Sequence, residues 1–291
     1  MAGQELRRAA VIGSPIAHSK SPLLHNAAYR ALGVELDYSR IEATEGDAAK
    51  LNEMLRNEPG WVGLSCTMPM KQALIPFMDS LSPRVAELGV LNTVVVHRSE
   101  DGTVTLSCEN TDVDGLMMSI AAMGAHKLER VVIFGAGNTA YAAIMAMAEA
   151  GVSHVDFVVR SVERAASAIE LSEHFGMTAS AILVPEFAQS VSHYDAAIST
   201  LPPHAADGFV ADLGLENLTP GTPLMDVTYD PWPSALADAW MSNGGVAANG
   251  LTMLLYQGIG QVKLFSGVTE ADWAHVTNVM CDAVGLPRPV N

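Results

Sequence analysis

Gly135, Ala136 and Gly137, near the middle of the chain, form a short turn whose residue types suit the binding of phosphate groups. The turn follows four apolar residues at 131–134 and precedes a run of good helix formers at 138–150. Glycines permit a tight turn without a Cβ penalty, and the first N–H groups of the helix, with its dipole, attract a pyrophosphate. Ala140 replaces the third glycine of the dinucleotide-binding pattern, which tolerates it. The candidate cofactor contacts at this turn are Gly135, Ala136, Gly137, Asn138 and Thr139.

Basic residues end the apolar strand expected at 155–159 and indicate the type of dinucleotide. In NAD enzymes an Asp or Glu about 20 residues past the glycines holds the ribose 2′-hydroxyl, whereas an Arg nearby accommodates the 2′-phosphate of NADP. Here Arg160 ends the strand, Arg164 follows one helical turn later, and no acid stands at the tip. The pattern favours NADP (NADPH) over NAD, unless Arg160 is an ordinary solvated charge. The candidate contacts in this segment are Arg160, Ser161 and Arg164.

Further polar residues stand at the ends of expected strands, where sites of α/β proteins gather. Ser199 and Thr200 end a strand expected to pass under the cofactor, although a simple turn explains them equally well. Thr67 and Lys71 follow the strand at 61–66. From spacing alone, Lys71 is a solvated charge in the first turn of a helix.

Three residues at the starts of helices complete the candidates. Ser21 precedes Pro22 and is expected to be the N-cap of its helix. Asp112 could be a first-turn acid favoured by the helix dipole. Ser19 has no such structural role, so two hydroxyls two residues apart could face a polyol.

The elements that must position these residues alternate between strands and helices, with no internal repeat. Apolar runs and turn residues predict strands at 9–13, 36–41, 61–66, 91–97, 103–107, 131–134, 155–159, 181–184, 194–198 and 224–227. Helices are expected at 22–32, 47–56, 82–89, 113–123, 138–150, 161–173, 235–241 and 251–265, before a last helix capped by Thr269 and ending near 284. This alternation predicts an α/β fold, doubly wound around the glycine turn.

Bulk composition argues against several classes of protein. The 291 residues are 49% hydrophobic and carry 16 basic against 32 acidic side chains, a net charge of −16, which disfavours nucleic acid and anionic membrane surfaces. Three cysteines give no paired framework, and the apolar run at 9–13 is too short for a signal peptide, so the cytoplasm is expected. Nine histidines show no ligand spacing, so no metal site is expected.

Several motifs occur together in the order found in one enzyme family. They are GSPIAHSKSPLLHN at 13–26, TMPMK at 67–71, Asn92-Thr93, Asn110-Thr111-Asp112 and the stretch 249–257. With them the chain resembles the shikimate dehydrogenase family over nearly its whole length. The resemblance implies two α/β lobes with the active site in the cleft between them. One is a discontinuous substrate-binding domain at 1–111 and 250–291, to which the last two helices return; the other is a Rossmann-like NADP-binding domain at 112–249.

The same resemblance implies roles for individual residues. The matching lysine and aspartate form the catalytic pair, here Lys71 and Asp112. The substrate-binding positions would be Ser19, Ser21, Thr67, Asn92, Tyr229 and Gln257. The expected cofactor contacts are completed by Ser199, Thr200 and Gly250.

The activity implied is the reversible, NADPH-dependent reduction of 3-dehydroshikimate to shikimate in the biosynthesis of aromatic amino acids. The cofactor would handle the hydride. A lysine ammonium near the carbonyl oxygen would stabilise negative charge and donate a proton, oriented by a neighbouring carboxylate. Hydroxyl and amide groups suit a small polyhydroxy ring. The expected partner is a small molecule, with no nucleic acid and no membrane, bound to a monomer or homodimer.

Departures from the family pattern keep alternatives open. Ser65 stands where Asn is common, Asn138 where a second Gly is usual, and Val159 where Asn usually precedes the arginine. One alternative is a quinate/shikimate dehydrogenase able to use NAD. Another is a non-catalytic dinucleotide-binding sensor of the same fold, against which the intact catalytic pair counts. Because Cys66 and Cys108 flank proposed site residues, a further hypothesis is that a thiol reagent inhibits the protein and shikimate protects it.

Overall fold

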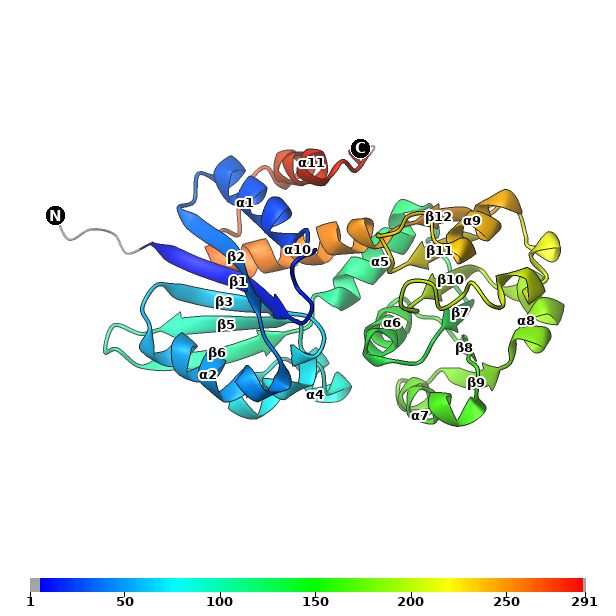
Figure 1. Ribbon diagram of the computed structural model, residues 1–291, viewed down its shortest axis with the longest axis horizontal. Coiled ribbons are helices and arrows are strands. Elements are labelled where there is room, and N and C mark those ends of the chain that lie inside the picture. The colour runs from blue at the N-terminus through cyan, green and yellow to red at the C-terminus, as the bar shows by residue number, and fades with distance from the viewer. Residues whose placement is uncertain (1–5, 290–291) are drawn as a thin grey trace. The chain divides into compact units, whose positions relative to one another are not determined.

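The chain folds into two compact units in the computed structural model of Figure 1, which describes residues 6–289. Unit 1 comprises the described residues up to Thr111 together with those from Gln257 onward, and unit 2 is Asp112–Tyr256. The second boundary lies inside a continuous helix, α10 (Gly250–Ser266), and not at its first residue.

A six-stranded mixed sheet forms the centre of unit 1. Its strands are β1 (Arg7–Gly13), β2 (Leu36–Glu42), β3 (Trp61–Cys66), β4 (Ser80–Leu81), β5 (Thr93–Arg98) and β6 (Val104–Glu109). They lie in the order β2-β1-β3-β5-β6-β4, with β1 parallel to β2 and β3, and β5 antiparallel to β3 and β6. Since β1 and β3 are parallel neighbours, the segments that follow them leave the sheet at the same edge.

Helices cover both faces of this sheet. They are α1 (Ser21–Leu32), α2 (Ala48–Asn57), α3 (Met70–Ala73), α4 (Pro83–Leu88), α11 (Trp273–Val284) and the later part of α10. On one face Leu64 of β3 packs into an apolar cluster with Leu55 of α2 and Val85 of α4. On the other face a Cβ on Gly63 would lie 2.3 Å from the ring of Phe265. The glycine at 63 therefore lets α10 approach the sheet closely.

Unit 2 is built on a six-stranded sheet whose neighbouring strands are all parallel. Its strands are β7 (Arg130–Phe134), β8 (His154–Val158), β9 (Thr178–Ile182), β10 (Ala196–Ser199), β11 (Pro223–Asp226) and β12 (Val246–Ala248). The order β9-β8-β7-β10-β11-β12 is the 3-2-1-4-5-6 order of the dinucleotide-binding fold, with its switch point between β7 and β10. The predicted α/β class and doubly wound arrangement are confirmed.

The helices of unit 2 lie on both faces of its sheet (Figure 1). They are α5 (Asp112–Ala122), α6 (Asn138–Glu149), α7 (Ala166–His174), α8 (Val184–Ser190) and α9 (Ala235–Ser242). Phe134, the last residue of β7, packs edge-on against Phe187 of α8 and Trp240 of α9, with ring centroids 5.2 and 6.4 Å apart. Each such pair contributes about 0.5–1.5 kcal/mol beyond the energy gained by burying its surface. These contacts therefore stabilise the position of the strand that leads into the glycine turn.

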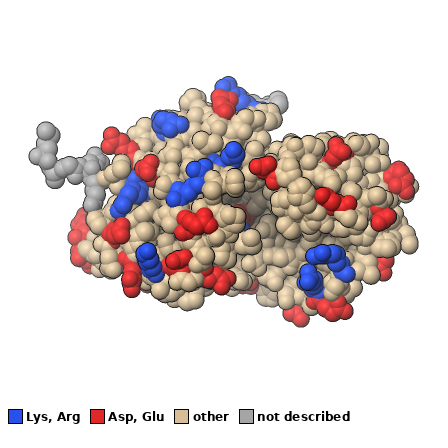
Figure 2. Space-filling model, in the orientation of Figure 1, with Lys and Arg blue, Asp and Glu red and all other residues tan. Residues whose placement is uncertain are grey.

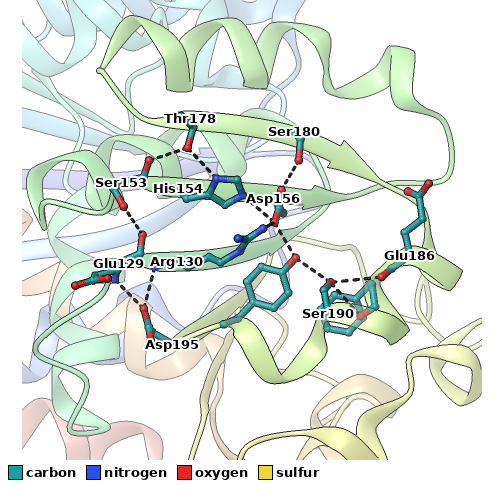
Figure 3. A network of polar contacts seen from close by, with 12 residues as sticks. Glu129, Arg130, Ser153, His154, Asp156, Thr178, Ser180, Glu186, Ser190 and Asp195 are labelled. Atoms are coloured by element: carbon teal, nitrogen blue, oxygen red, sulfur yellow. Dashed lines mark hydrogen bonds and ion pairs between the residues drawn. The ribbon is translucent and has the colours of Figure 1, made fainter.

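The starts of β7, β8 and β9 meet in a polar network around Asp156 (Figure 3). The Asp156 carboxylate is 2% exposed and accepts hydrogen bonds from Arg130 and Tyr194, both at 2.8 Å. Ser180 also donates to it, and His154 Nε2 lies 2.9 Å from the oxygen that Arg130 binds. Burial acts to raise the pKa of Asp156, but these hydrogen bonds outweigh burial and hold the pKa below its usual value.

Asp156→Asn is expected to destabilise unit 2 by about 1–3 kcal/mol at neutral pH, because buried donors lose their charged acceptor. A carboxylate whose pKa is lowered on folding stabilises the fold above its unfolded pKa of about 3.9. It loses that contribution as the pH falls through the folded value. Urea unfolding should therefore show a large loss at neutral pH and a smaller one below about pH 4. Asp207→Asn, at an exposed carboxylate beside His204, is the control and should change little. Equal losses at both pH values would contradict this role of the charge.

Capping differs from the expectation at two helices. Ser21 is not the N-cap of α1, because the helix begins at Ser21 itself and Lys20 occupies the cap position. Thr269 does not cap the last helix, because α11 begins after Asp272, whose carboxylate accepts the N–H of His275 at 3.0 Å. In both cases the position of the first helical turn decided which residue caps it.

Some predictions of strands and helices were also wrong in part. The strand expected at 181–184 is β9, which ends at Ile182, and Val184 instead begins α8, where Pro185 suits the first helical turn. The helix expected at 161–173 starts as a 3₁₀ turn over Val162–Ala165 and is α-helical only from Ala166. The short strands β4 and β12, with two and three residues, were not predicted because they are too short to show a period. No helix in the described part of the chain is long and apolar enough to cross a membrane.

Candidate active site

A cavity of about 520 Å³ lies at the carboxyl ends of β7 and β10, at the switch point of the unit 2 sheet. Predicted cofactor residues supply much of its lining: Gly135, Ala136, Gly137, Arg160, Arg164 and Thr200. The rest of the wall is apolar, and sequence analysis missed it: Val158, Val159, Val184, Leu201, Pro202, Ala205 and Phe209. Leu201 and Pro202 directly follow Thr200 and could have been included, whereas nothing local to Val184 or Phe209 signals a place in this wall.

Gly135 allows the chain to turn tightly between β7 and the cavity. Its φ of 96° lies in the left-handed region, and a Cβ there would stand 2.8 Å from Thr200 Oγ1. Thr200 is itself fixed, since its backbone N–H and its hydroxyl donate to the carbonyl oxygen of Phe134 at 2.9 and 3.0 Å. A side chain at position 135 would therefore displace the end of β10. The first N–H groups of α6, which have no partner within the helix, follow directly after this turn.

Charge is unevenly distributed in unit 2. Residues 112–256 contain four basic side chains against sixteen acidic ones, and Arg160 and Arg164 both line the cavity. Of the other two basic residues, Arg130 is paired with the buried Asp156 in the network of Figure 3, and Lys127 lines a separate groove. On the face of unit 2 seen in Figure 2, acidic side chains are scattered while basic ones occur in one group. The cavity therefore holds half of the positive charge of an acidic unit, which favours an anionic ligand there.

Three predicted cofactor residues near the turn do not line this cavity. Asn138 and Thr139 form the first turn of α6. The hydroxyl of Ser161 donates to Glu163 Oε2 at 2.5 Å, and this bond lowers the pKa of Glu163. Ser161 is thus engaged by a neighbouring acid in this structure.

Two further predicted cofactor residues lie elsewhere in unit 2. Ser199, the last residue of β10, is 2% exposed and does not line this cavity. A Cβ on Gly250 would lie 2.0 Å from the carbonyl oxygen of Val227 and 3.2 Å from the ring of Tyr229. Close packing against the segment after β11 therefore explains the glycine at 250, and the structure brings it together with Tyr229.

A second group of predicted residues comes together in unit 1, at the start of β5. The buried side chain of Asn92 donates from Nδ2 to Thr111 Oγ1 at 2.9 Å and to Gln257 Oε1 at 3.3 Å. Its Oδ1 accepts the backbone N–H of Thr111 at 2.8 Å. Asn92 and Gln257, 165 residues apart in sequence, thus belong to one cluster of neutral donors and acceptors. Such groups can bind hydroxyls without a net charge.

Both predicted catalytic residues are anchored next to this cluster by their backbones. The carbonyl oxygen of Lys71 accepts the N–H of Leu91 at 2.9 Å, and Leu91 directly precedes Asn92. Asp112 directly follows Thr111, begins α5 and is 6% exposed. Lys71 is half-buried. The segments that carry Lys71 and Asp112, although far apart in the sequence, are therefore both attached to the segment around Asn92.

The predicted hydroxyl residues leave the sheet of unit 1 at one edge. Ser19, in the loop after β1, donates from Oγ to Ser21 Oγ at 3.3 Å. Arg40 of β2 holds that loop by donating to the carbonyl oxygen of Ser19 at 3.0 and 2.5 Å. Thr67 follows β3, and its backbone N–H donates to the carbonyl oxygen of Ile12 in β1 at 2.9 Å. Arg40 was not predicted, because its contact depends on the pairing of β1 with β2.

The two cysteines near these motifs are enclosed in the core of unit 1. Cys66 and Cys108 are both 4% exposed and belong to the apolar cluster that includes Leu64 of β3. Burial raises the pKa of both thiols, that of Cys108 to about 11. Because the thiolate is the reactive form, the structure argues against the hypothesis that a thiol reagent inhibits the folded protein. Within residues 6–289 no group of three or more His, Cys, Asp or Glu side chains could hold a metal ion.

Fold and site together define a class of protein. It is an α/β protein that joins a doubly wound sheet of the dinucleotide-binding type to a second α/β unit rich in hydroxyl and amide groups. The family model described as the shikimate dehydrogenase substrate binding domain matches residues 11–94, which lie in unit 1. The shikimate dehydrogenase (NADP(+)) of Geobacter metallireducens is 31% identical over 264 residues, covering 89% of this chain and 90% of its own.

Solved structures give the same result. A shikimate 5-dehydrogenase from Mycobacterium fortuitum is 39% identical with a TM-score of 0.80, covering 95% of this chain and 97% of its own. The shikimate dehydrogenase of Mycobacterium tuberculosis is 37% identical with a TM-score of 0.80, covering 96% of this chain and 98% of its own. The chain belongs to the shikimate dehydrogenase family, whose members are oxidoreductases. The resemblance inferred from the sequence motifs is thereby confirmed.

Proposed function

We propose that the protein catalyses the NADP(H)-dependent interconversion of 3-dehydroshikimate and shikimate, in aromatic amino-acid biosynthesis in the cytoplasm. One observation carries the proposal: the switch-point cavity of an acidic unit is lined by the glycine turn and by Arg160 and Arg164. The curated relative from Geobacter metallireducens, named as an NADP(+) enzyme, supports the same choice of cofactor.

The lining of the cavity fits such a dinucleotide in three respects. The glycine turn and the start of α6 supply N–H groups for the pyrophosphate. Arg160 and Arg164 would bind the 2′-phosphate as charge-assisted donors. The apolar wall, which includes Val159, Leu201 and Phe209, suits the faces of a purine ring. Unit 2 is accordingly proposed as the dinucleotide-binding domain and unit 1 as the substrate-binding domain.

The substrate would be bound by the hydroxyl and amide groups of unit 1. The proposed substrate-binding residues are Ser19, Ser21, Thr67, Asn92, Tyr229 and Gln257. Their neutral donors and acceptors match a ring that carries several hydroxyls, and an analogue lacking one hydroxyl would leave a buried polar group without its partner.

Lys71 and Asp112 are proposed to move the proton of the reaction. When bound, the reduced nicotinamide supplies the hydride that adds to the carbonyl carbon of 3-dehydroshikimate. The Lys71 ammonium stabilises the negative charge that develops on the carbonyl oxygen and donates a proton to it, giving the hydroxyl of shikimate. Asp112 orients that ammonium. The reverse reaction returns the proton to Lys71.

A two-by-two assay of the purified protein tests this proposal. Shikimate or quinate is combined with NADP⁺ or NAD⁺, and reduced nicotinamide is followed by its absorbance. We expect activity with shikimate and NADP⁺ that exceeds every other combination. A preference for quinate or NAD⁺ would instead assign a quinate/shikimate dehydrogenase, and no turnover in any combination, despite dinucleotide binding, would favour a sensor.

A further inference from the structure

Gln261 lies one helical turn after Gln257 on α10, and its side chain is 1% exposed. Its Nε2 donates to the carbonyl oxygen of Asn92 at 3.2 Å and to Thr93 Oγ1 at 2.9 Å. Its Oε1 accepts the hydroxyl of Ser65 at 2.8 Å. A buried amide with all these partners is held in a single orientation.

Two backbone groups determine which atoms donate throughout this network. The carbonyl oxygen of Asn92 can only accept, so Nε2 of Gln261 faces it and Oε1 faces Ser65. The backbone N–H of Thr111 can only donate, so Oδ1 of Asn92 faces it. Thr93 links the two amides, because its hydroxyl accepts from Gln261 and donates to Asn92 Oδ1 at 2.8 Å.

The orientation of Asn92 in turn determines that of Gln257. With Oδ1 of Asn92 directed to Thr111 and Thr93, its Nδ2 donates to Gln257 Oε1 at 3.3 Å. The amide oxygen of Gln257, Oε1, therefore faces Asn92. Fixing the oxygen end also fixes the direction in which the Nε2 group of Gln257 points.

We propose that Gln261 is a positioning residue, which fixes the side-chain amide of Asn92 and, through it, that of Gln257 in the orientation that binds a polyhydroxy substrate. The inference rests on the proposed function for the identity of that substrate. Gln261 holds Asn92 by two routes: directly at the Asn92 carbonyl, and through Thr93 at Oδ1. A packing residue of the same size without the donor could fill the volume but could not set these directions.

Gln261→Met and Gln261→Glu test this role. Both keep the approximate length of the side chain, but methionine has no amide, and a glutamate carboxylate would place an acceptor against the Asn92 carbonyl. Each is expected to raise KM for shikimate about tenfold, the effect of losing roughly one net hydrogen bond, with KM for NADP⁺ unchanged. Arg56→Met is the matched control, because Arg56 also donates to backbone carbonyls of unit 1, those of Phe77 and Val104, without a link to Asn92.

Hydrogen–deuterium exchange supplies a readout that does not depend on activity. The N–H of Thr111, which donates to Asn92 Oδ1, should exchange faster in Gln261→Met than in Arg56→Met when the two are compared at equal global stability. Unchanged KM for shikimate, or exchange no faster than in the control, would overturn the proposal. If the wild-type protein does not oxidise shikimate, the proposed function fails, while the exchange result still decides whether Gln261 orients Asn92.

Discussion

Lys71→Ala is expected to lower kcat for shikimate oxidation about 10³-fold, because proton transfer by a positioned side chain contributes roughly 10²–10⁴. The Kd for NADP⁺ should stay within about twofold of the wild-type value, because Lys71 is not proposed to contribute to binding of the dinucleotide. The cavity proposed for the dinucleotide is lined only by residues of unit 2, whereas Lys71 is anchored in unit 1 beside Asn92. Steady-state kinetics and calorimetric titration with NADP⁺ measure the two quantities.

Lys50→Ala is the matched control for this change. Lys50 is an exposed lysine of α2 in the same unit, so its loss should leave kcat and KM near wild type. Wild-type turnover in Lys71→Ala would return Lys71 to the surface charge that spacing alone suggests. Weakened NADP⁺ binding together with lost turnover would indicate a damaged fold and not a missing proton donor.

Replacing both Arg160 and Arg164 by alanine is expected to raise KM for NADP⁺ about 100-fold. Hydrogen bonds to charged groups contribute about 1.5–3 kcal/mol, and every 1.4 kcal/mol is a tenfold change in affinity. KM for NAD⁺ should change less than about threefold, because NAD⁺ lacks the 2′-phosphate that these arginines would bind. Kinetics with the two dinucleotides at saturating shikimate measure the change in preference.

Lys127→Ala separates a local effect from a change in total charge. It removes one positive charge from unit 2, half of what the double variant removes, at a groove that does not include the glycine turn. NADP⁺ kinetics of this variant should match wild type. Equal losses with NADP⁺ and NAD⁺ in the double variant would show that the arginines support the cavity without recognising the 2′-phosphate.

The sequence by itself determined where most strands and helices lie and which of their ends contribute residues to the site. β3 was predicted with its observed ends, 61–66, and β7 and α6 within one residue of theirs, because apolar runs, glycines and helix formers act locally. The strand–helix alternation then implied parallel sheets, whose carboxyl ends gather at one edge. For that reason the glycine turn, Arg160 and Thr200 could be assigned to one cavity before any tertiary contact was known.

The tertiary structure decided which side of each element faces the site. Thr200, just past the end of β10, lines the cavity, whereas Ser199, the last residue of β10, is buried and does not; the sequence alone cannot say which of the two faces the cavity. Gly250 fits a motif, yet its close contact is with Val227. Gln261 shows no motif at all; its role depends on β3 and β5 placing Ser65 and the Asn92 carbonyl within hydrogen-bonding distance of α10. Preferences for strands, turns and helices depend on short stretches of sequence. These hydrogen bonds instead join residues up to 196 positions apart and exist only once the sheet and the helix have packed.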